Sequence, residues 1–198
     1  SMMIIGGQPV LAISGKTLPV ISPIDGQEIA QIPDAGRGDV DLAVAAARRS
    51  FEGTIWARLA PAARKSVLLK WADLIEANAL ELAVLGVRDN GTEISMAYKA
   101  EPFSAIGTIR YYAEAIDKVY GEVAPTGPDT LGMILREPVG VVAAIVPWNF
   151  PMMIAAWKIA PALASGNSVV VKPSEMASLT VMRMVALALE AGLPDGVL

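Results

Sequence analysis

The chain has 198 residues, a formal net charge of -4 and a sequence pI near 4.9. Its 54% hydrophobic and 18% charged residues are enough for a substantial core, which excludes a disordered chain, and its acidic balance offers no electrostatic footprint for nucleic acid or an anionic membrane. The absence of Cys and His excludes disulfides, a thiolate nucleophile, a Ser-His-Asp triad and Cys- or His-based metal sites within these residues, and we expect no metal.

The first half of the chain contains predicted strands followed by predicted helices. Residues 8–33 alternate short β-like runs with turn signals at residues 14–16 and 23–26, which predicts small antiparallel strands at an edge. Apolar residues then recur at helical spacing. The four predicted helices cover 38–51, a segment from Pro61 through Ile75, 79–90 with Asn78 as N-cap and Gly91 as terminator, and about 102–118.

A short segment separates these helices from the last third of the chain. Residues 120–137 predict a two-stranded ribbon with a turn-rich tip at 126–129. An isolated ribbon is marginally stable in water, so we expect it to lean on another surface, such as a second subunit.

The last third predicts a β-α-β-α order. The run 139–147 is typical of a strand buried on both faces, and a helix over 152–166, a second strand over 168–173 and a helix capped by Ser178 follow. This is the opening of a doubly wound parallel sheet in an α/β fold, and we expect further strands to complete the sheet.

One stretch calls for a test against a membrane span. Residues 138–157 include no charged residue over 20 positions, about the length that crosses a bilayer. Pro147, Asn149 and Pro151 lie in its middle, where they would interrupt a helix and leave polar groups unsatisfied in lipid. The first ten residues also lack the cationic region of a secretory signal. We therefore expect a soluble, cytoplasmic protein.

Polar residues follow both predicted strands, at the edge where open α/β sheets bind ligands. After the second strand, Glu175 is suited to accept the hydroxyl groups of a ribose, and Lys172 can add a hydrogen bond or offset phosphate charge. An exposed ion pair of little energetic value explains the same two residues. The first β-α turn has no G-x-G-x-x-G pattern, so a standard pyrophosphate cradle is not supported.

Asn149 follows the first strand, between an aromatic residue and two prolines. A rigidly held amide is a suitable donor to a developing oxyanion, although an Asn that satisfies the backbone of its own turn is the commoner case. The neighbouring Trp148 is more typical of a core or interface aromatic than of a base-stacking platform.

Across these motifs the chain resembles the N-terminal portion of the aldehyde dehydrogenase superfamily. Within that family, residues 111–123 most resemble the gamma-glutamyl-gamma-aminobutyraldehyde dehydrogenase branch. The usual Asn-Gly-Lys-Pro of the family is replaced here by residues 90–93, Asn-Gly-Thr-Glu. The segments that carry the resemblance are PVISPIDGQEIAQIPDA (19–35), VDLAVAAARRSF (40–51), REPVGVVAAIVPWNFPMMIAAWKIAPALASGNSVVVKPSE (136–175) and AGLPDGVL (191–198).

The resemblance implies a role for each candidate residue. Asn149 matches the amide that stabilises a thiohemiacetal oxyanion. The cofactor-binding residues are those that match the adenosine-ribose loop and the segment lining the nicotinamide side: Lys172, Ser174 and Glu175, and Ile145, Val146, Pro147 and Trp148. It also implies three parts: strands and helices of the cofactor-binding domain (1–119), an oligomerisation ribbon (120–137) and the first part of a Rossmann-like sheet (138–198).

The implied reaction is oxidation of a small aldehyde to its carboxylic acid by a homodimer or homotetramer. A thiolate attacks the carbonyl, hydride passes to NAD or NADP, and a water activated by a Glu hydrolyses the thioester. The nucleophilic Cys and general-base Glu of the family lie beyond residue 198, so we expect this chain alone to be inactive. Glu175 should repel a ribose 2′-phosphate, which favours NAD. Two alternatives stay open: a non-catalytic nucleotide-binding or oligomerisation module, and a CoA-acylating enzyme.

Overall fold

The computed structural model describes residues 2–53 and 55–198. Its strands are β1 (Met3–Ile5), β2 (Gln8–Val10), β3 (Thr17–Ile21), β4 (Glu28–Pro33), β5 (Glu122–Ala124), β6 (Gly132–Ile134), β7 (Val141–Ile145) and β8 (Ser168–Lys172). Its helices are α1 (Arg37–Glu52), α2 (Pro61–Ala77), α3 (Ala79–Asn90), α4 (Ile94–Lys99), α5 (Glu101–Ala115), the 3₁₀ turn η1 (Ile116–Lys118), α6 (Pro151–Ala164) and α7 (Leu179–Glu190).

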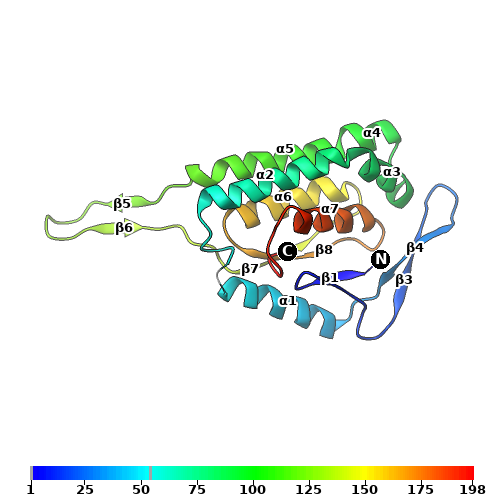
Figure 1. Cartoon of the computed structure of the whole chain (residues 1–198), viewed down its shortest axis with the longest axis horizontal. Helices are drawn as coiled ribbons and strands as arrows, with labels where there is room; N and C mark the ends of the chain where they lie inside the picture. Colours follow the sequence, from blue (N-terminus) through cyan, green and yellow to red (C-terminus); the bar gives the residue numbers. More distant parts are fainter. Residues whose placement is uncertain (1, 54) are drawn as a thin grey trace.

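The β-α-β-α unit expected from the sequence is present. β7 and β8 pair in parallel, in register from Val141 opposite Ser168 to Ile145 opposite Lys172. In Figure 1, α6 and α7 lie on one side of this pair and α1 on the other. After α7 the chain returns to β8, where the Val169 N–H donates to the Val197 carbonyl at 2.7 Å. The α/β fold class is therefore confirmed.

The prediction that the first parallel strand is buried on both faces is wrong. Alternate residues of a strand point to opposite faces, and here one face packs into the core, with Ala144 and Val146 each 3% exposed. On the other face Ala143 is exposed and Ile145 is 77% exposed. An unbroken apolar run does not by itself reveal whether something covers each face.

The core lies between the helices and the β7–β8 pair. Most of its fully buried side chains come from α2, α5, α6 and α7, and Leu68, Ile109 and Leu163 are 0% exposed. Trp56 and Trp71 are the largest of the buried side chains. Each indole N–H donates to a helix carbonyl at 2.9 Å, so the single polar atom of each buried indole has a hydrogen-bond partner. Residues from both halves of the chain thus share one core. Within the described ranges, no helix combines the length and apolar character needed to cross a bilayer.

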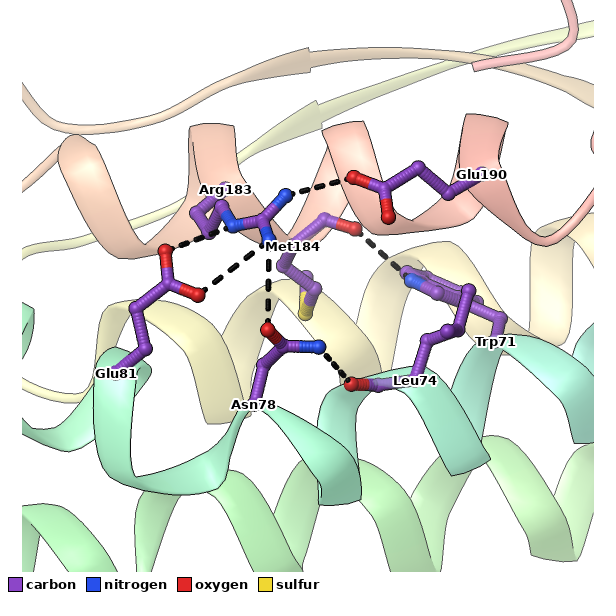
Figure 2. A network of polar contacts seen from close by, with 7 residues as sticks. All are labelled: Trp71, Leu74, Asn78, Glu81, Arg183, Met184 and Glu190. Atoms are coloured by element: carbon purple, nitrogen blue, oxygen red, sulfur yellow. Dashed lines mark hydrogen bonds and ion pairs between the residues drawn. The ribbon is translucent and has the colours of Figure 1, made fainter.

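A polar network fastens α7 to the α2–α3 corner (Figure 2). The Arg183 guanidinium contacts Glu81 at 2.9 Å and Glu190 at 2.8 Å, and it also donates to the Asn78 carboxamide oxygen. Asn78 occupies the N-cap position of α3, as expected, but its side chain does not cap that helix. Its amide nitrogen donates back to the Leu74 carbonyl at 2.7 Å, and its oxygen accepts from Arg183 at 3.4 Å.

The N-terminal strands form two antiparallel hairpins, β1–β2 and β3–β4, as the turn signals predict. The first hairpin starts at Met3, ahead of the predicted range. A further difference is α4, a six-residue helix that the helical spacing did not reveal. The Glu93 side chain accepts N–H groups from Ser95 and Met96 at its start, so the departure from the family pattern at residues 90–93 supplies a helix cap.

The predicted ribbon is formed by β5 and β6, which pair antiparallel and project away from the body of the molecule (Figure 1). Its apolar side chains are open to solvent: Val123 is 72% and Met133 is 62% exposed. The partner surface expected for it from the sequence stays a prediction.

Candidate functional site

Two loops leave the sheet side by side at its carboxyl end. Ile145 and Lys172 are paired across β7 and β8, and one step later the Val146 N–H donates to the Lys172 carbonyl at 3.1 Å. The segments that follow, 146–150 and 173–178, therefore start from adjacent points, which is where ligands bind in open α/β sheets. The sequence placed its candidate residues on these two loops.

The cofactor candidates after β7 differ in their exposure. Ile145 is 77% and Trp148 is 58% exposed, and Pro147 is exposed between them, so all three side chains can meet a ligand. Of the two typical roles considered, core or interface aromatic, the exposure of Trp148 excludes the core, and the interface role stays a prediction. Val146 is 3% exposed and belongs to the core, so a ligand at this position would meet its backbone and not its side chain.

Asn149 is exposed just ahead of α6. Its side-chain amide forms no hydrogen bond with any of the described residues. The commoner case, in which an Asn side chain satisfies the backbone of its own turn, is therefore not found here. Phe150 separates it from Pro151, the first residue of α6, and the Phe150 carbonyl accepts the Ile154 N–H at 3.0 Å. An amide donor is therefore available to a ligand at the end of β7.

Lys172 and Glu175 form an ion pair at the end of β8, with 2.8 Å between Nζ and Oε2 and exposures of 61% and 58%. The hydrogen bond from Lys172 lowers the pKa of Glu175, so this carboxylate is ionised at neutral pH. An exposed carboxylate beside an ammonium suits a ribose diol, and an isolated pair of this kind contributes little to stability, about 0–1 kcal/mol. Ser174 is buried, and its hydroxyl accepts the Met176 N–H at 3.2 Å.

The N-terminus of α7, which follows the second loop, is held by a residue that the sequence did not single out. Asp89 lies in the last turn of α3, is 2% exposed, and accepts the Leu179 N–H at 2.8 Å. Burial raises its pKa to about 6. The predicted cap, Ser178, holds the N-cap position without a side-chain capping bond, and the Asp89 carboxylate accepts the first N–H of the helix. An acidic residue in the last turn of a helix is unfavourable beside the negative end of the helix dipole. This unfavourable placement is the signal by which the sequence could have revealed Asp89.

The N-terminus of α6, which follows the first loop, has a similar arrangement. Glu101, at the start of α5, is 6% exposed, and its Oε2 accepts the Met152 and Met153 N–H groups at 3.1 and 3.4 Å. Burial raises its pKa, opposed by these two hydrogen bonds. An acidic residue in a first turn suits its own helix, so nothing in the sequence marked it.

Two open grooves are present, and one of them is lined by the cofactor candidate Ile145. One runs along β7 against Trp157, Lys158 and Pro161 of α6, and the other lies between α5 and Trp157, lined by Tyr111 and Tyr112. Neither is lined by Asn149, Lys172 or Glu175, so these grooves do not join the two loops into one cleft. Across residues 2–53 and 55–198, no cluster of three or more His, Cys, Asp or Glu side chains could hold a metal ion.

Comparison with known proteins supplies the context for this geometry. The model of the aldehyde dehydrogenase family matches residues 11–198. The NADP/NAD-dependent aldehyde dehydrogenase PuuC of Escherichia coli (strain K12) is 50% identical over 196 residues, 99% of this chain and 40% of that protein. The aminoacetaldehyde dehydrogenase of Pseudomonas aeruginosa is 46% identical over 94% of this chain and 38% of its own length.

Solved structures agree with these relatives. The gamma-glutamyl-gamma-aminobutyraldehyde dehydrogenase of Burkholderia cenocepacia J2315 superposes with a TM-score of 0.97 at 50% identity, over 99% of this chain and 40% of that one. An indole-3-acetaldehyde dehydrogenase in complex with NAD+ gives 0.96 at 49% identity, over 98% and 39%. The chain spans about two fifths of the length of these relatives.

Proposed function

The chain belongs to the aldehyde dehydrogenase family, and we propose that it forms the N-terminal part of an enzyme that oxidises an aldehyde to its carboxylic acid with NAD or NADP. The family and the resemblance to its gamma-glutamyl-gamma-aminobutyraldehyde dehydrogenase branch, both expected from the sequence, are confirmed. One observation carries the proposal for this site: Asn149, whose amide has no hydrogen bond to the described residues, and an exposed Lys172–Glu175 pair follow the carboxyl ends of two adjacent parallel strands.

Asn149 donates a hydrogen bond to the oxyanion that forms when the aldehyde carbonyl is attacked. Support comes from its free amide and from the way the loop is held, by β7 before it and by α6 after it. A donor fixed in this way is already oriented when charge develops, which is where such groups gain their value.

Lys172 and Glu175 hold the adenosine ribose, and Ile145, Pro147 and Trp148 line the nicotinamide side, with Val146 contributing its backbone. The exposure of the ion pair fits this role because a diol can replace the ammonium as the partner of the carboxylate. A bound nicotinamide cofactor supplies the hydride acceptor. Glu175 is ionised, so it repels a 2′-phosphate and favours NAD.

The remaining chemistry comes from polypeptide outside these 198 residues. The family reaction needs a thiolate and this sequence contains no Cys, so the nucleophile lies elsewhere, and the resemblance implies the same for the general-base Glu. The three-part division at residues 119 and 137, the homo-oligomeric state and the cytoplasmic location belong to the same proposal.

The relatives limit what can be proposed about the substrate. Proteins of 45–50% identity carry the names of phenylacetaldehyde, aminoacetaldehyde and gamma-glutamyl-gamma-aminobutyraldehyde dehydrogenases. They differ in the group attached to the aldehyde and share the aldehyde itself. We therefore propose a small aldehyde as the substrate class.

The test uses an aldehyde-oxidising polypeptide that carries these residues as its N-terminal part, with the 198-residue chain alone as the negative control. We expect Asn149→Ala to lower kcat by about 100- to 1,000-fold. Glu175→Gln should weaken the preference for NAD over NADP, and Glu114→Gln, which alters an exposed, ion-paired carboxylate on α5, should change neither quantity. NADH formation by the mass-verified chain alone, or an unaltered kcat in Asn149→Ala, would contradict the proposal.

A further inference from the structure

A single buried carboxylate satisfies the first turn of α6. An α-helix starts with N–H groups that have no partner within the helix. Here Pro151 has no N–H, and those of Met152 and Met153 both donate to Glu101 Oε2, at 3.1 and 3.4 Å. The next one, on Ile154, reaches the Phe150 carbonyl at 3.0 Å. Each N–H from Met152 to Ile154 is therefore accounted for, and those of Met152 and Met153 depend on a residue 51 and 52 positions earlier in the chain.

The position of α6 determines where Asn149 lies. The loop that carries Asn149 is short, since it runs from the end of β7 at Ile145 to the start of α6 at Pro151. Pro147 and Pro151 each restrict one φ angle within it. The position of a loop this short is determined by the elements at its two ends, and Glu101 binds the element at one end, α6.

We propose that Glu101 is a positioning residue for the oxyanion donor: by binding the first N–H groups of α6, its carboxylate fixes the loop from which Asn149 reaches the reacting carbonyl. This inference rests on the proposed function, because it gives Glu101 a purpose through the role of Asn149. Glu101 itself touches the helix and not the substrate.

The electrostatics agree with this assignment. A carboxylate at a helix N-terminus is stabilised by the helix dipole and by N–H donors, and two such donors converge on Glu101. Burial of the side chain, 6% exposed, raises its pKa, and the two hydrogen bonds oppose that rise. A buried carboxylate is costly, and a hydrophobic side chain would fill the same space more cheaply. The need for an acceptor at the first N–H groups of α6 explains why a carboxylate is buried at position 101.

The first measurement uses the chain itself and does not involve activity. In Glu101→Ala, we expect the amide protons of Met152 and Met153 to exchange about 10- to 100-fold faster, the factor that corresponds to a lost hydrogen bond to a charged group. Glu101→Gln retains an acceptor oxygen and should show a smaller change. Glu114→Gln, at the other end of the same helix, should leave both amides unchanged. If Glu101→Ala fails to fold, the Gln variant provides the comparison. Unchanged exchange of both amides in a folded Glu101 variant would overturn the inference.

The second measurement separates this inference from the proposed function. In the aldehyde-oxidising polypeptide, Glu101→Ala should lower kcat by about tenfold or more and change the KM for NAD by less than that, because the Lys172–Glu175 pair lies on the other loop and, of the exposed cofactor candidates, only Pro147 and Trp148 share the loop of Asn149. Adding Glu101→Ala to Asn149→Ala should cause no further loss. If Asn149→Ala lowers kcat and Glu101→Ala does not, the positioning role fails and the proposed function stands. If Asn149→Ala has no effect on kcat, the proposed function itself fails.

Discussion

The buried carboxylate of Asp89 should make the stability of this protein depend on pH in an unusual direction. The side chain is 2% exposed, one oxygen accepts the Leu179 N–H, and the other has no hydrogen-bond partner among the described residues. Burial raises its pKa from 3.8 to about 6. The folded chain therefore binds this proton more tightly than the unfolded chain does. The contribution to stability is complete below pH 3.8 and is lost as pH rises through about 6.

The size of the effect follows from the shift. A rise of about 2 pKa units, at about 1.4 kcal/mol for each unit, corresponds to about 3 kcal/mol of unfolding free energy. Asp89→Asn removes the titration and keeps an oxygen that can accept from Leu179. Between about pH 4 and about pH 8, the stability of the variant relative to the wild type should therefore increase by about 3 kcal/mol.

Urea unfolding at a series of pH values measures this difference. Trp56 and Trp71 are each 1% exposed, so tryptophan fluorescence will report the loss of the core. The contributions of groups that titrate in both proteins cancel when the two curves of unfolding free energy against pH are subtracted. Parallel curves would refute the reasoning, and a wild type that gains stability relative to the variant as pH rises would show that the pKa of Asp89 is lowered, not raised.

Two further predictions use the same unfolding assay. Gly91 has φ +72°, and a Cβ there would lie 2.9 Å from the Pro23 ring, whereas Gly15 has φ +67° with no such neighbour. Gly91→Ala should therefore lower the free energy of unfolding by about 1 kcal/mol more than Gly15→Ala does. Equal losses in the two variants would contradict the contact. Arg183→Met removes contacts to two carboxylates, and since the Arg183 side chain is 28% exposed we expect a loss of about 1 kcal/mol that shrinks at about 1 M salt. A loss that is independent of salt would assign the effect to packing instead.

Local patterns in the sequence predicted the elements and their order. A β-branched run, a helical stretch and a second β-branched run favour a parallel pair, and a parallel pair brings its two carboxyl ends together. Asn149 and the Lys172–Glu175 pair could be proposed because they are polar residues directly after those strands. Each of these signals depends on residues a few positions apart, so no tertiary contact is needed to recognise them.

Tertiary packing decided which groups satisfy the helix ends and which strand face is covered. Asn78 and Ser178 stand at the predicted N-cap positions, yet the Asn78 amide bonds with Arg183 and the Leu74 carbonyl. Asp89 caps α7 from 90 residues away. The exposed Ile145 and the buried Glu101 were likewise invisible to spacing. A hydrogen bond or a covered face requires that two segments meet in space, and residue order along one chain specifies which elements can form but not which side chains will face each other once they pack.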